Sequence, residues 1–142
     1  MTLQYVAEKR PELVSFFQPP TDADIAEFER VIGATIPNSL KIFWLRWGTG
    51  SVFETEEFFS PAEDLDTGES ALTLINEYRA IGLPNEFFVF HRGLGGVTCM
   101  NSFGTIVQIN DTDSSIKKQF ATIDEWFDDV LMREYANRYS LE

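Results

Sequence analysis

The clearest hydrophobic pattern in the chain lies between residues 21 and 48, where apolar positions recur with helical spacing in two consecutive series. The first series comprises Ile25, Phe28 and Ile32, and the second comprises Leu40, Phe43, Trp44 and Trp47. Thr21 suits the N-cap of the first helix, and Gly33 suits the left-handed residue that follows a helix end. Pro37 suits the first turn of the second helix, which we expect to end at Gly48. The pattern therefore predicts two short helices joined by a tight turn.

The pattern elsewhere predicts another helix before this pair, and strands and two helices after it. We expect a helix over residues 3–17, in which Pro11 can start a new turn. After residue 51 the apolar spacing becomes that of strands, with Val52, Phe53, Phe58 and Phe59 as the apolar positions. The later elements that we expect are a helix over residues 70–81, strands over residues 86–92, 96–101 and 105–110, and a final helix that begins at a Thr122–Glu125 capping box.

Helices first, strands in the middle and a closing helix indicate the α+β class. We expect N-terminal helices, a central and mainly antiparallel β-sheet, and a C-terminal helix packed on that sheet. At 142 residues, of which 44% are hydrophobic, the chain fits a single domain over residues 1–142 with one core.

The charge balance is strongly acidic, with 11 Lys and Arg against 23 Asp and Glu and a formal net charge of −12. Such a surface repels nucleic acid and anionic membranes and attracts basic proteins. One cysteine, Cys99, excludes an internal disulfide. The sequence offers neither an apolar stretch long enough to span a bilayer nor the pattern of a secretory signal. We therefore expect a cytoplasmic protein with no membrane or direct nucleic-acid partner.

The region from 21 to 48 also matches a motif: an acidic-capped helix with an apolar-x-x-aromatic-Glu core, a glycine, an apolar-Pro step, and an aromatic-rich helix ending in glycine. The matching positions are Ile25, Phe28, Glu29, Ile32, Gly33, Ile36, Pro37, Leu40, Phe43 and Gly48. In this motif, and in the order of its later elements, the chain resembles the SUKH superfamily of bacterial toxin-immunity proteins and fungal cell-wall assembly regulators. The resemblance implies a non-enzymatic protein that binds a cognate toxin, often a nuclease or deaminase, and blocks it. It also implies that the motif is a fold signature, in which Glu29 makes structural hydrogen bonds.

Catalytic and metal sites are hard to assemble from the remaining residues. His91 and Cys99 can lie on neighbouring strands with Asn101 nearby, but a cysteine in a strand is usually a small core residue. One His and one Cys fall short of a zinc set, and Asp111 with Asp113 lacks the glycine and distal glutamate of a calcium loop. Residues 93–96 are rich in glycine but lack the lysine of a phosphate-binding loop. We therefore expect no cofactor, no metal and no enzymatic activity.

The acidic residues after position 53 are the strongest binding candidates. We expect a basic toxin to contact Glu54, Glu56, Glu57, Glu63, Asp64 and Asp66. Phe53, Phe58 and Phe59 interleave with these residues, either as apolar anchors or as core, with core favoured for Phe58 or Phe59. An ordinary solvated face is the simplest alternative interpretation of the charges. Two other functions stay open: a regulatory scaffold of the cell-wall assembly type, and a small hydrolase.

Overall fold

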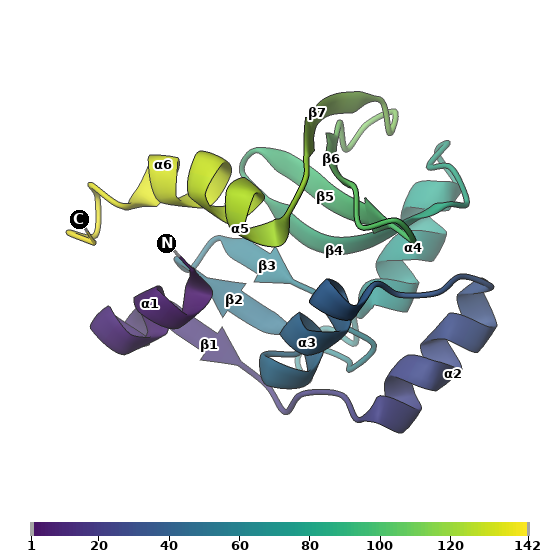
Figure 1. Ribbon diagram of the computed structural model, residues 1–142, viewed down its shortest axis with the longest axis horizontal. Helices are drawn as coiled ribbons and strands as arrows, with labels where there is room; N and C mark the ends of the chain where they lie inside the picture. The colour runs from purple at the N-terminus through teal and green to yellow at the C-terminus, as the bar shows by residue number, and fades with distance from the viewer. Residues whose placement is uncertain (1, 142) are drawn as a thin grey trace.

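The chain forms a seven-stranded sheet in which every neighbouring pair is antiparallel and the strands follow one another in chain order (Figure 1). This computed structural model describes residues 2–141. The strands are β1 (Val14–Phe16), β2 (Gly50–Val52), β3 (Glu56–Phe58), β4 (Phe87–Gly93), β5 (Gly96–Asn101), β6 (Ile106–Ile109) and β7 (Ile116–Phe120). The fold is α+β, as the sequence predicts.

Helices lie before β1, between β1 and β2, between β3 and β4, and after β7. They are α1 (Leu3–Lys9), the 3-10 turn η1 (Pro11–Leu13), α2 (Asp22–Ile32), α3 (Asn38–Arg46), α4 (Ala71–Arg79), α5 (Ile123–Trp126), the π-helical η2 (Phe127–Met132) and α6 (Arg133–Tyr135). We refer to α5, η2 and α6 together as the C-terminal helical segment. It begins directly after β7 and lies along the sheet, with the C-terminus close to α1 in the view of Figure 1.

The predicted helix pair is confirmed as α2 and α3, together with its boundary signals. The Thr21 hydroxyl accepts from the Asp24 N–H, and the Asp24 carboxylate accepts from the Thr21 N–H. Gly33 ends α2 at a φ of 69°, a left-handed conformation that glycine adopts without strain. Glu29 accepts from the Ile36 N–H at 2.9 Å, so this motif residue fixes the turn before α3 by a structural hydrogen bond.

The predicted helix over residues 3–17 is wrong in its second half. It ends at Lys9, and Pro11 begins a 3-10 turn that leads into strand β1. The residue before a proline is pushed out of the helical region, and Arg10 has extended φ and ψ of −138° and 71°. Strand β7 was absent from the prediction. At the final helix, Thr122 accepts from the Glu125 N–H as expected, but the Glu125 carboxylate accepts from the Ala121 N–H, so the predicted capping box is only half formed.

Aromatic side chains fill the core between the sheet and its helices. Phe53, Phe58 and Phe59 are each at most 2% exposed, which places all three in the core and removes them as surface anchors. Trp44 of α3 is fully buried, and its Nε1–H donates to the Phe59 carbonyl at 3.0 Å. Trp126 packs edge-on against His91 with ring centroids 4.7 Å apart. The C-terminal helical segment thus covers the part of the sheet that carries His91.

Candidate functional site

A buried polar network joins strands β3, β4 and β5 to the C-terminal helical segment. His91 Nε2 lies 2.9 Å from Glu56 Oε1, and His91 Nδ1 lies 2.8 Å from the Thr98 hydroxyl. The Tyr135 hydroxyl donates to Glu56 Oε2 at 2.8 Å, and the Leu94 N–H donates to the same oxygen at 3.3 Å. The side chains of His91 and Glu56 are only 1% and 2% exposed. The Thr55 hydroxyl is a fourth donor to Glu56, at 3.4 Å, so the carboxylate sits inside the protein and is held by four donors.

The sheet register and one glycine create the space for this carboxylate. Phe58 is opposite His91, so Glu56, two residues before Phe58 on the same face, projects toward Gly93. A Cβ atom on Gly93 would overlap the Glu56 carboxylate. Because Gly93 has no side chain, its face of β4 leaves room for the Glu56 carboxylate.

The network favours an ionised Glu56 and a neutral His91. Burial opposes the charge on Glu56, but the hydrogen bonds from His91, Tyr135 and Leu94 outweigh it and hold the pKa of the carboxyl below its usual value of 4.5. Burial also lowers the pKa of His91 below 6.5, against the opposing effect of Glu56. We assign the His91 proton to Nε2, which donates to Glu56, while the Thr98 hydroxyl donates to Nδ1. Burial, together with Glu56, raises the pKa of Tyr135 to about 12.

The structure corrects part of the predicted acidic surface. Glu56 is 1% exposed and bound within the network, so it is not part of an exposed acidic surface. Glu57 is half-buried and pairs with Arg92 at 3.1 Å, and Arg92 also pairs with Glu69 at 3.2 Å. Glu54 is exposed, but it lies in the turn before β3, whereas Glu63 follows β3. The predicted residues thus lie before, within and after β3.

A different acidic surface forms where the loop after β3 meets α2. Glu63 lies beside Asp24 and Glu27 around a depression of about 220 Å³. We call it the acidic groove; its other lining residues are Phe28, Val31, Pro61, Ser70 and Leu72. Asp66 is exposed on the same loop, where Asp64 accepts from the Asp66 and Thr67 N–H groups and shapes the turn. The helical spacing of Asp24 and Glu27 shows that they share a face, but only the tertiary fold brings Glu63 to them.

A cavity of about 230 Å³ lies beside the buried network, and we call it the Glu56 cavity. It is lined by Glu56, Leu94, Gly95, Val130, Leu131, Glu134 and Tyr135. Val130 and Leu131 belong to the π-helical turns of the C-terminal helical segment. Single π-helical turns are uncommon and occur often at functional sites. The sequence shows the apolar spacing of this segment but gives no signal for its wider turns.

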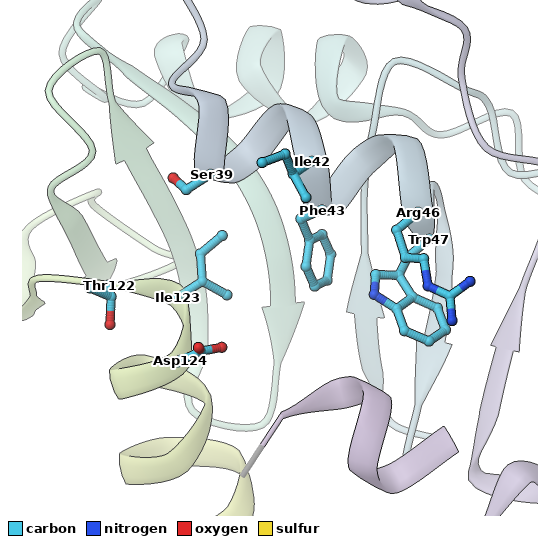
Figure 2. Close-up of a pocket in the computed structure, with 8 residues that line it drawn as sticks. All are labelled: Ser39, Ile42, Phe43, Arg46, Trp47, Thr122, Ile123 and Asp124. Carbon is cyan, nitrogen blue, oxygen red and sulfur yellow. The ribbon is translucent and has the colours of Figure 1, made fainter. Parts of the chain in front are cut away.

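An apolar groove separates α3 from the start of α5 (Figure 2). Phe43 and Ile123 project into the space from the two sides, and Arg46 and Asp124 mark its edges. A second depression continues it toward α1, with Leu3 and Gln4 in its wall. Ile42 on α3 is 69% exposed at this surface. The groove carries one base and one acid, so its charge does not favour either sign in a partner.

The residues considered for chemistry do not come together as a catalytic pair. Cys99 is opposite Val89 in the sheet, and His91 is opposite Thr98. Burial raises the pKa of the Cys99 thiol, which disfavours the reactive thiolate. Asp113 accepts from the Ser115 N–H in a polar turn. Within residues 2–141 no three His, Cys, Asp or Glu side chains are grouped so that they could hold a metal ion, and no helix in that range is long and apolar enough to cross a membrane.

The fold and these surfaces define a small α+β domain with surface grooves and a buried polar network. The model of the SMI1/KNR4 family (SUKH-1) matches residues 19–129, so the chain belongs to this family. Its fold is similar to a crystal structure of a protein from Pseudomonas syringae pv. tomato, with a TM-score of 0.70 at 18% sequence identity. That similarity covers 90% of this chain and 97% of the other. No curated protein gives a significant match.

Proposed function

We propose that this chain is a cytoplasmic immunity protein that binds a cognate protein toxin and neutralises the toxin by occluding its substrate-binding surface. The expected target is a basic nuclease. Membership of the SUKH-1 family is the observation that carries this proposal. The net charge of −12 supports a basic partner, because opposite charges steer two proteins together. The chain would block its target by contact alone, without chemistry of its own.

The exposed acids around and beside the acidic groove are the contact surface that we propose. Glu63 and Asp66 are exposed there, and Asp24 extends the negative surface along α2, where Glu27 is paired with Arg30. The groove floor supplies apolar area, because Val31 is 49% exposed. An acidic rim over an apolar floor suits lysine and arginine side chains, whose alkyl stems cover apolar surface while their charges stay at the rim. Glu54 is outside this surface.

The test searches the neighbouring genes for a toxin domain, which is then purified with the chain or co-expressed with it in bacterial cells. The double variant Glu63→Lys and Asp66→Lys should slow association by about tenfold at low salt, and the difference should shrink in 0.5 M salt because screening weakens steering. Glu77→Lys with Glu86→Lys is the matched control, since it makes the same charge change at two exposed acids elsewhere. Equal association rates for the two double variants would remove the acidic groove from the proposal. The absence of any complex with the toxin domain would refute the immunity function itself.

A further inference from the structure

The Glu56 cavity has ionisable groups of one sign. Glu56 and Glu134 line it, and no basic residue does. The four groups that donate to the Glu56 carboxylate are a neutral imidazole, the hydroxyls of Tyr135 and Thr55, and a backbone N–H. The network therefore solvates the buried negative charge with dipoles and supplies no cation to it. A buried charge without an opposite charge attracts one strongly, because the protein interior screens it little.

One cation already lies at the rim of the cavity. Arg138 pairs with Glu134 at 3.3 Å, and the two side chains are 51% and 56% exposed. The Arg138 guanidinium also lies over the Tyr135 ring, 5.0 Å from its centroid. Exposed pairs of this kind contribute little free energy, so a cation that arrives at Glu134 can replace Arg138 there.

The size and walls of the cavity limit what can enter. Its volume of about 230 Å³ is below the range of about 300–1,000 Å³ that holds drug-sized ligands. Leu94, Val130 and Leu131 supply apolar walls, and Glu56 supplies the negative end. A single side chain with an alkyl stem and a cationic head matches both features.

We propose that the Glu56 cavity receives one cationic side chain, a lysine or arginine, presented by a partner protein. This inference rests on the proposed function for the identity of that partner, the toxin, and adds a second contact point next to the C-terminal helical segment. The alkyl stem lies along Leu94 and Val130, and the charged head approaches Glu56 with Glu134 at the entrance. The acidic groove attracts the toxin at long range, and the Glu56 cavity binds one side chain of the toxin.

The first arm of the test needs no toxin. N-acetyl-lysine N-methylamide is titrated into the ¹⁵N-labelled protein, with the uncharged N-acetyl-norleucine N-methylamide as the matched probe. We expect saturable shifts of the Leu94 and Gly95 amide signals with the lysine probe, and at least tenfold weaker binding of the norleucine probe. Equal binding of the two probes, or no saturable shift with lysine, would overturn the inference.

The second arm uses two exposed positions that can gain the same charge. Leu94→Lys places a competing cation at the cavity. It should lower the affinity of the protein for the lysine probe and for the toxin at least tenfold. Phe103→Lys is the control, because Phe103 is 92% exposed in the turn between β5 and β6. Both residues are largely exposed, so neither change should unfold the protein. Unaltered toxin binding by Leu94→Lys would overturn the cavity as a contact while leaving the immunity function in place. A wild-type chain that binds no toxin would refute the proposed function and the partner named here, whereas saturable lysine binding would still support the cationic pocket.

Discussion

Removal of the Tyr135 hydroxyl tests the buried network with the least change in shape. Tyr135→Phe deletes one oxygen from a side chain that is 1% exposed, and it leaves the ring stacked on Phe53 at 4.4 Å. The substitution removes the charge-assisted hydrogen bond to Glu56, and such bonds are worth about 1.5–3 kcal/mol. It also removes the hydrogen bond with the Thr55 hydroxyl at 2.7 Å, but that hydroxyl keeps the Phe53 carbonyl and Glu56 as acceptors. We expect the free energy of unfolding to fall by about 2 kcal/mol at pH 7.

Urea unfolding of wild type, Tyr135→Phe and Tyr5→Phe measures this effect. The Tyr5 hydroxyl donates to the neutral Leu141 carbonyl at 2.8 Å in a partly buried place, so its loss should cost about 1 kcal/mol. The excess cost at Tyr135 should shrink as the pH falls below 4.5 toward the lowered pKa of Glu56, because protonation removes the charge from the bond. Equal costs for the two variants at pH 7, or a Tyr135 cost that does not change with pH, would refute an ionised Glu56.

Three further predictions concern the same core. Gly93→Ala should destabilise the protein by about 1–3 kcal/mol in urea unfolding, because the added Cβ overlaps the Glu56 carboxylate; a cost near zero would contradict that packing. The pKa of His91 is lowered by folding, so its contribution to stability is complete above pH 6.5 and is lost as the pH falls toward the folded-state pKa. Because His91 is the only histidine, stability measured from pH 7 to pH 5 should decline, and a constant stability over this interval would be the contrary result. The Cys99 thiol should react with a thiol reagent only after unfolding, whereas rapid reaction of the native protein would show that it is accessible.

The sequence predicts the elements whose signals are local. The pair α2 and α3 has a capping residue, a left-handed glycine and apolar stripes within 28 residues. Each of these signals depends only on residues close to it in the sequence. Strand β5 has the predicted limits of Gly96 and Asn101. Strand β1 is three residues long and pairs with β2, more than 30 residues further along the chain, so no local signal marks it. Strand β7 is an edge strand with Lys117 and Lys118 exposed, and its polar character conceals it.

The buried network was less predictable because charge is normally a sign of exposure. Glu56 follows Glu54 and precedes Glu57, and such a series usually faces solvent. Strand alternation does carry a signal, since Glu56 is two residues from the buried Phe58 and shares its face. What the sequence cannot supply is the register that sets Phe58 opposite His91, because it depends on a pairing across the segment that contains α4. The same long-range dependence conceals the approach of Glu63 to α2.

We propose that this chain protects cells by binding a toxin. Growth of bacterial cells that express a toxin domain from a neighbouring gene, with and without the chain, measures this protection. We expect the chain to restore growth and to co-purify with the toxin domain as a stable complex. Continued growth arrest in cells that contain the folded chain, together with no complex between the purified proteins, would contradict this proposal.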